Sequence, residues 1–129
     1  MPVASSLVAI VDDEESVRRA LGRLLRSAGF DVQTFASGVE FMHSLARSSP
    51  QCLVLDLRMP HMTGFDVQGA LLEARANVPV VIITGDDSPE TRDMTLGRGA
   101  TAYLRKPVDE AMLLDAIQNA IGQQPGAHP

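Results

Sequence analysis

Short apolar runs alternate with segments of helical periodicity along nearly the whole chain. Almost wholly apolar runs occupy 7–11, 52–55 and 80–83, and two more strand-like segments fall at about 31–35 and 101–105. Apolar runs of this length are typical of strands covered on both faces. Because a helical segment separates each strand from the next, we expect parallel strands with helices on both sides of the sheet. The pattern predicts a single α/β domain of five strands and five helices.

The first two expected helices carry their own start and stop signals. Apolar residues recur with helical spacing over 17–28, and Gly29 follows at the place of a left-handed C-terminal cap. The second helix begins after Ser37, with Glu40 three residues later as in a capping box, and extends to about Arg47. These signals predict helix ends independently of the apolar pattern.

The remaining three helices differ in how well they can pack. The third is expected over about 64–76, and the last follows Asp109, a capping residue, with a clear apolar stripe. The fourth opens with Ser88 as its cap and Pro89 in its first turn, but its body, ETRDMTLGRG, has few apolar residues and two glycines. We expect the fourth helix to be the least firmly docked.

Polar residues follow the strands at their carboxyl ends, where ligands of parallel α/β sheets bind. Three carboxylates meeting there would raise one another's pKa unless a cation lay between them. Oxygen ligands without His or Cys favour Mg²⁺, with Mn²⁺ as the alternative. The residues expected at this edge are Asp12 and Asp13 after the first strand, Asp56 after the third, Thr84 after the fourth, and Lys106 with Pro107 after the fifth.

These residue types suit phosphoryl transfer. Asp56 ends a buried run at the mouth of the fold, so a metal ion and a lysine can partly neutralise it while one oxygen stays free to attack phosphorus. A lysine charge and a threonine hydroxyl would contact the oxygens of a PO₃ group. Asp56 is the candidate nucleophile, supported by Lys106 and Thr84.

Charge and composition exclude several classes of protein. The net charge is −5 with a pI near 5.0, whereas nucleic-acid binders usually carry a basic stripe. No apolar run approaches the roughly 20 residues that cross a bilayer. The first residues lack the basic segment of a signal peptide, so we expect a cytoplasmic protein. The single cysteine, Cys52, lies in an apolar run and is expected to be a buried structural thiol.

Four motifs carry a resemblance to a known family. They are VDDEE at the first strand end, Asp56 with Met59, Pro60 and Gly64 behind it, VIITG with Thr84, and GATAYLRKP with Lys106 and Pro107. With these motifs the chain is similar, from about residue 7 to 121, to the receiver domain of bacterial two-component response regulators. The resemblance implies a flavodoxin-like, doubly wound sheet of order 2-1-3-4-5, with an N-terminal extension at 1–6, the receiver domain at 7–122 and a tail at 123–129.

The resemblance also implies a role for each residue at this edge. The phosphoryl group would come from a histidine kinase or a phosphotransfer protein, and its arrival would switch the protein between two arrangements. The domain would be a signalling phosphoacceptor with intrinsic phosphorylation and dephosphorylation chemistry, not an enzyme. The implied roles are phosphoacceptor for Asp56, Mg²⁺ ligands for Asp12, Asp13, Asp56 and the Arg58 backbone carbonyl, phosphoryl contacts for Thr84 and Lys106, a switch formed by Thr84 and Tyr103, and a cis peptide bond at Pro107.

The implied output surface comprises the fourth helix, the fifth strand and the fifth helix. A downstream protein or a fused output domain would recognise it, and a homodimer could form through it. The segments ITGDD and YLRKPVDE are similar to receivers of the nitrogen-fixation regulator type, which often continue into a helix-turn-helix domain. The chain is either a stand-alone receiver or the first part of a longer regulator; we favour the former because its tail resembles an end.

Two other classes are weighed against this interpretation. A phosphatase of the haloacid dehalogenase type normally has a second Asp two residues after its nucleophile, where this chain has Arg58. A receiver-like interaction domain that is never phosphorylated usually lacks the acceptor, the acid pair or the lysine, all of which are present here. A nucleotide-binding domain would need a glycine-rich phosphate loop, and the sequence has neither GxxxxGK nor GxGxxG.

Arg58 and Asp86 are more individual, since each lies two residues beyond a site residue. We hypothesise that they form an ion pair across the mouth of the site and tune the lifetime of the phosphorylated state. The three histidines lack the partners of a catalytic or metal-binding His and are interpreted as surface residues: His43, His61 and His128.

Overall fold

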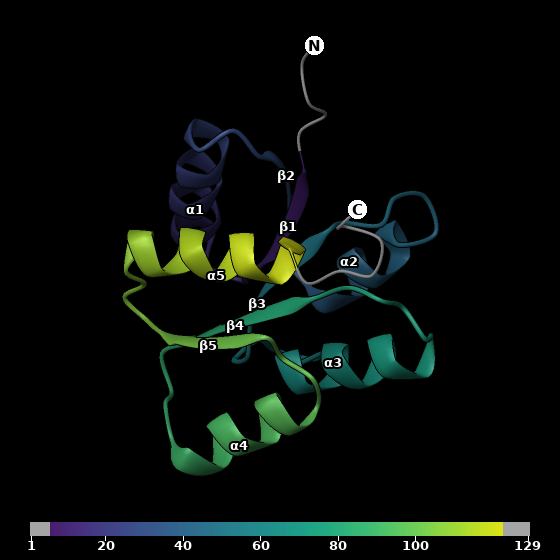
Figure 1. The fold of residues 1–129 in the computed structure, drawn as a ribbon. Helices are drawn as coiled ribbons and strands as arrows, with labels where there is room; N and C mark the ends of the chain where they lie inside the picture. The colour runs from purple at the N-terminus through teal and green to yellow at the C-terminus, as the bar shows by residue number, and fades with distance from the viewer. Residues whose placement is uncertain (1–5, 123–129) are drawn as a thin grey trace.

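A five-stranded parallel sheet forms the centre of the molecule, flanked by five helices (Figure 1). The computed structural model describes residues 6–122. Its strand order, β2-β1-β3-β4-β5, confirms the predicted flavodoxin-like topology. The strands are β1 (Leu7–Val11), β2 (Asp31–Phe35), β3 (Cys52–Asp56), β4 (Val80–Thr84) and β5 (Ala102–Arg105). The helices are α1 (Glu15–Ser27), α2 (Gly38–Ser44), α3 (Gly64–Glu73), α4 (Pro89–Gly97) and α5 (Glu110–Gly122).

The sheet separates two apolar cores. On one face, α1 and α5 pack through residues such as Leu25 and Ile117. On the other, α2 and α3 pack through Phe41 and Val67, and α4 lies on the same side as α3 (Figure 1). Nearly every residue of β1, and every residue of β3 and β4, is buried, which explains why those runs are continuously apolar. No helix of the described chain has both the length and the apolarity needed to cross a membrane.

Helix beginnings follow the predicted capping residues. The Ser37 side chain accepts a hydrogen bond from the Glu40 N–H, and the Ser88 side chain accepts one from the Thr91 N–H. The complete reciprocal capping box lies at α3, between Thr63 and Asp66, and was not anticipated. At α5, the Asp109 carboxylate accepts from the N–H of residue 112 at 2.9 Å, as the sequence predicts.

Two helices end earlier than the sequence suggests. In α2 the regular helix stops at Ser44, because residues 45–47 bond to carbonyls three positions back and so form tighter turns. In α3 the helix stops at Glu73, because Arg75 adopts a left-handed backbone with φ of 52° and the N–H of Ala76 returns to Leu71. The predicted ends at about residues 47 and 76 were therefore three residues too far along the chain.

The fourth helix buries little of its surface. Thr95 is the residue of α4 that is fully buried, whereas Met94 and Leu96 are each more than two-fifths exposed. The predicted contrast with α1 and α5 is present, since both of those helices bury several apolar side chains. Helix α4 therefore packs on the edge of the sheet through few buried side chains.

Candidate functional site

Two aspartates meet at the carboxyl edge of the sheet because β1 and β3 are neighbours in register. Val11 pairs with Leu55, so Asp12 and Asp56, the residues that follow them, lie side by side. Both carboxyl groups are buried, with side chains no more than 3% exposed, while Asp13 beside them is exposed. Oxygens of these three aspartates all lie within 4.8 Å of one another. The crowding of acids that the sequence predicts is therefore real.

Lys106 brings the compensating charge from β5. Its Nζ lies 2.8 Å from Asp12 Oδ2, 3.3 Å from Asp56 Oδ1 and 3.5 Å from Glu14 Oε1. Its backbone N–H donates to the Thr84 carbonyl at 2.8 Å, which ties the lysine to the end of β4. The Lys106–Pro107 peptide bond is cis, as the resemblance implies.

Burial and charge act in opposite directions on Asp56. Loss of solvent raises its pKa, the neighbouring Asp12 raises it further, and Lys106 and the Arg58 N–H oppose them, leaving a pKa of about 6. For Lys106, burial alone would lower the pKa, but Asp12 and Asp56 outweigh it and raise the pKa. The Lys106 ammonium group therefore stays charged near neutral pH, while the Asp56 carboxyl loses its proton only as the pH rises through about 6.

The aspartate cluster fits a hard metal ion. Asp12 Oδ1 accepts a hydrogen bond from the Glu14 N–H at 2.9 Å. The other oxygen, Oδ2, and Asp56 Oδ1 are shielded from solvent and lie close to the lysine without a well-aligned hydrogen bond. Buried acceptors in this state are suited to a cation, and three carboxylates supply the oxygen ligands that Mg²⁺ and Mn²⁺ prefer.

Loops from two strand ends close over the mouth of the site. The Arg58 guanidinium pairs with the Asp86 carboxylate, as hypothesised, and both side chains are more than half exposed. Behind Asp56 the chain is held by Gly64, whose N–H donates to the Leu57 carbonyl at 3.1 Å. A Cβ on Gly64 would lie only 2.6 Å from the Asp56 carbonyl oxygen, so the close approach of α3 to β3 needs glycine here.

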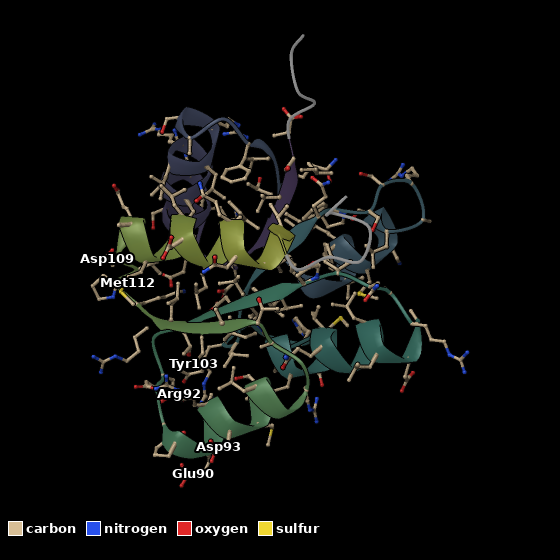
Figure 2. All side chains as sticks on the ribbon, in the orientation of Figure 1. Glu90, Arg92, Asp93, Tyr103, Asp109 and Met112 are labelled. Atoms are coloured by element: carbon tan, nitrogen blue, oxygen red, sulfur yellow. The ribbon has the colours of Figure 1, made fainter. Side chains whose placement is uncertain are left out.

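The expected switch residues lie beside this mouth in different settings. Thr84 is fully buried, and its hydroxyl accepts from the Asp86 N–H at 3.0 Å. Tyr103 is half-buried on β5, with Arg92 of α4 over its ring at 5.7 Å (Figure 2). Its hydroxyl is shielded from solvent without a well-aligned hydrogen bond, and burial, followed by the Asp87 carboxylate beside it, raises its pKa.

The chain matches the model of a known family over most of its length. The family model described as the response regulator receiver domain matches residues 8–118, which include every residue of the aspartate–lysine cluster. The chain belongs to the response regulator receiver family. The acidic pocket at the carboxyl edge of the sheet is thus that of a signalling domain.

Named relatives agree with this assignment. The response regulator protein TodT of Pseudomonas putida is 37% identical over 121 residues, covering 94% of this chain and 53% of its own. Nodulation protein W of Bradyrhizobium diazoefficiens is 39% identical over 113 residues, covering 87% of this chain and 49% of its own. The chain therefore spans about half the length of the curated relatives it matches.

Solved structures agree as well. A response regulator receiver protein from Burkholderia phymatum superposes with a TM-score of 0.81 at 39% identity, covering 94% of this chain and 99% of that one. Together with the strand order, this similarity establishes the flavodoxin-like fold of the receiver domain.

Several contacts of the receiver domain were not foreseen. Glu14, the N-cap residue of α1, contacts Lys106, and Arg92 stacks on Tyr103. The acidic VDDEE segment was a usable signal for the first contact, whereas the second has no sequence signal. His43 and His61 are exposed, as expected, and His128 lies outside the described residues, as do 1–5 and 123–129 of the predicted terminal segments.

Proposed function

We propose that this receiver domain accepts a phosphoryl group on Asp56 in a Mg²⁺-dependent reaction. The observation that carries the proposal is the grouping of Asp12, Asp13 and Asp56 around one point with Lys106 against it. Neither a phosphatase nor an unphosphorylated interaction domain is favoured, because the family match and the complete set of residues both point to phosphoacceptor chemistry.

In the proposed reaction, an Asp56 oxygen attacks the phosphorus of a phosphohistidine on a histidine kinase or a phosphotransfer protein. The O–P bond forms as the P–N bond breaks, and the electron pair leaves with the imidazole nitrogen, which takes up a proton. Lys106 contacts the incoming oxygens as a fixed positive charge. The same site would use small phosphodonors and would release phosphate to water, so that both phosphorylation and dephosphorylation are intrinsic to the domain.

Asp12, Asp13, Asp56 and the backbone carbonyl of Arg58 would hold the magnesium ion. When bound, the ion supplies positive charge against the phosphoryl oxygens and the crowded carboxylates. Manganese has the same preference for oxygen ligands and would substitute for it. Asp12 is already oriented for this role, because its Oδ1 accepts a hydrogen bond from the Glu14 N–H.

We further propose that phosphorylation changes the face formed by α4, β5 and α5, and that a binding partner recognises this change. Thr84 would turn its hydroxyl from Asp86 to the phosphoryl group, and Tyr103 would move inward with it. Charged side chains lie on this face beside Tyr103, among them Glu90, Arg92 and Asp93 of α4, and Asp109 stands just before α5 (Figure 2). A downstream protein, an output domain on the same chain or a second copy would bind there, and the kinase would meet the receiver in the cytoplasm.

Peptide mapping tests the acceptor assignment directly. Trypsin releases Ser48–Arg58, a peptide in which Asp56 is the sole carboxylate side chain. After treatment with acetyl phosphate and Mg²⁺, borohydride reduction should convert Asp56 of this peptide to homoserine. Conversion in the peptide that carries Asp12 and Asp13, with none in Ser48–Arg58, would contradict the proposal.

A further inference from the structure

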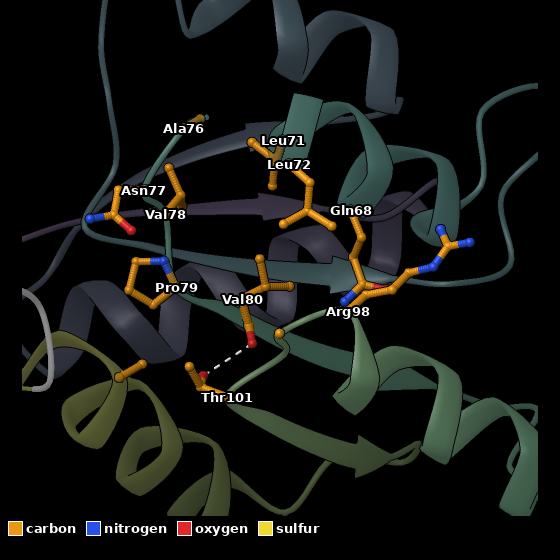
Figure 3. A pocket seen from close by; sticks show the side chains of 12 residues that line it. Gln68, Leu71, Leu72, Ala76, Asn77, Val78, Pro79, Val80, Arg98 and Thr101 are labelled. Atoms are coloured by element: carbon orange, nitrogen blue, oxygen red, sulfur yellow. Dashed lines mark hydrogen bonds between the residues drawn. The ribbon is translucent and has the colours of Figure 1, made fainter. Parts of the chain in front are cut away.

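Lys106 is the one lysine of the sequence, so the phosphoryl contact proposed above depends on a single ammonium group. Because Lys106 follows β5, this group lies at the carboxyl edge of the sheet. The apolar cavity of about 270 Å³ between α3, the start of β4 and the loop after α4 opens at the other end of the strands (Figure 3). The groups that can act directly on Lys106 are therefore its neighbours at the carboxyl edge.

Three carboxylates share this ammonium group. Asp12 Oδ2 lies 2.8 Å from Nζ and Asp56 Oδ1 lies 3.3 Å from it, and both side chains are almost fully buried. Glu14 Oε1 lies 3.5 Å from Nζ, and the Glu14 side chain is 62% exposed. Asp12 and Asp56 belong to the proposed magnesium site, whereas Glu14 does not. Glu14 is thus the one of the three whose charge is not also required for metal binding.

The side chain of Glu14 is available for this contact because it does not cap a helix. Glu14 is the N-cap residue of α1, yet its side chain makes no capping hydrogen bond. Its N–H donates to Asp12 Oδ1 at 2.9 Å, which fixes its backbone beside the site. Shorter N-cap residues such as Asp and Asn accept hydrogen bonds from the first helical N–H groups. The longer glutamate instead extends to Lys106.

We propose that Glu14 is a positioning residue that draws Lys106 away from the phosphoryl group and so slows phosphorylation of Asp56. The inference rests on the proposed function, because it concerns the same phosphoryl transfer. The Glu14 carboxylate and a phosphoryl group on Asp56 are two anions beside one ammonium group. If Lys106 leaves Glu14, their ion pair is lost, and if Lys106 stays, two anions share one cation. Both effects oppose phosphorylation, so the direction of the effect is the same in either case.

Three variants separate the contact from the charge. Glu15 is the exposed first residue of α1, so Glu15→Gln removes the same charge one residue further along. Glu14→Asp keeps the charge, but its shorter side chain is suited to capping α1 and falls short of Lys106. With Mg²⁺ and sub-saturating acetyl phosphate, the initial rate of gain of phosphorylated mass should rise about two- to five-fold in Glu14→Gln, as expected for loss of a partly exposed ion pair. The rate should also rise in Glu14→Asp and stay unchanged in Glu15→Gln.

The single lysine also reports the contact without phosphorylation. In the metal-free chain labelled with ¹³C-lysine, the Cε–Hε NMR signal arises from Lys106 alone. This signal should shift in both Glu14 variants and keep its wild-type position in Glu15→Gln. A change in the stability of α1 alone would not produce this pattern, because Glu14→Gln and Glu14→Asp differ in their ability to cap the helix.

The outcomes distinguish this inference from the proposed function. Equal phosphorylation rates in the wild type and Glu14→Gln, or a lysine signal that does not shift in Glu14→Gln, would overturn the inference and leave the proposed function intact. A Glu14→Asp rate equal to that of the wild type would assign the effect to charge alone and overturn the positioning role. No phosphorylation of the wild type would instead overturn the proposed function, and this inference with it.

Discussion

Asp56 shows how one buried acid can oppose the stability of the fold that holds it. Without metal its pKa in the folded chain is about 6, above the ordinary value of 3.8, because burial and Asp12 penalise its charge. The folded state thus binds the proton more tightly than the unfolded chain. This carboxyl favours folding below pH 3.8, and its contribution is lost as pH rises through 6.

Replacing Asp56 with Asn should therefore stabilise the metal-free protein at pH 7.5. We expect a gain of ~1–2 kcal/mol in the free energy of unfolding, less than the full pKa shift implies because solvent screens the mouth of the site. Urea unfolding in the presence of a chelator measures it, and the gain should shrink at pH 5. A destabilised variant at pH 7.5, or a gain independent of pH, would refute this reading of Asp56.

The Arg58–Asp86 pair is expected to control water at the mouth of the site. Removing either partner frees the other, so Arg58→Ala and Asp86→Ala should change the rate of dephosphorylation non-additively. Rates for the two single variants and the double variant, followed by loss of the phosphorylated mass with time, give the coupling. Strictly additive effects would show that the Arg58–Asp86 pair does not set the lifetime of the phosphorylated state.

The position of a side chain could be predicted from sequence where the backbone determines it, and not where its own rotamer does. Asp12, Asp56 and Lys106 were found from sequence because backbone pairing alone brings strand ends together. The stacking of Arg92 on Tyr103 depends on the rotamer of an exposed side chain. Periodicity carries no information about such rotamers.

At the scale of elements, the junction between β3 and α3 is the most constrained. A Cβ on Gly64 would approach the Asp56 carbonyl oxygen and the Leu57 Cα within 2.8 Å, and backbone atoms at this distance must shift. We expect Gly64→Ala to destabilise the fold by about 1–3 kcal/mol and to slow phosphorylation, because the displaced backbone carries Asp56.

The matched control lies five residues along the same helix. A Cβ on Gly69 meets its nearest neighbour, Arg98 Nη1, at an ordinary 3.7 Å. Gly69→Ala should therefore be neutral or stabilise the protein by about 0.5–1 kcal/mol in the same chemical denaturation experiment. Equal effects at the two positions would mean that helix propensity, not the close approach of α3 to β3, determines the outcome.

Elements were predicted better than their ends. Three apolar runs and two further strand-like segments located the five strands, and the start of each helix followed a capping residue or the end of a strand. The C-terminal ends of α2 and α3 were missed, because tightening turns and a left-handed arginine have no reliable sequence signature. For α4, scarcity of apolar residues correctly predicted shallow burial.

At the scale of the whole molecule, alternation of strands and helices predicted a parallel sheet, but not which strands are neighbours. The order 2-1-3-4-5 came from the resemblance, since several orders satisfy the same alternation. That order places Asp12 beside Asp56 and is the reason that distant segments form one acidic pocket. The fold thereby supplies the electrostatics that the proposed function needs.

The mass of the intact chain after treatment with acetyl phosphate tests this account most directly. With Mg²⁺ the wild type should gain about 80 Da, the mass of one added PO₃ group with its proton. The gain should disappear on removal of Mg²⁺ by a chelator and in Asp56→Asn. An unchanged mass with Mg²⁺ present, or an equal gain in Asp56→Asn, would contradict the claim that the clustered acids and Lys106 leave one Asp56 oxygen free for phosphorylation.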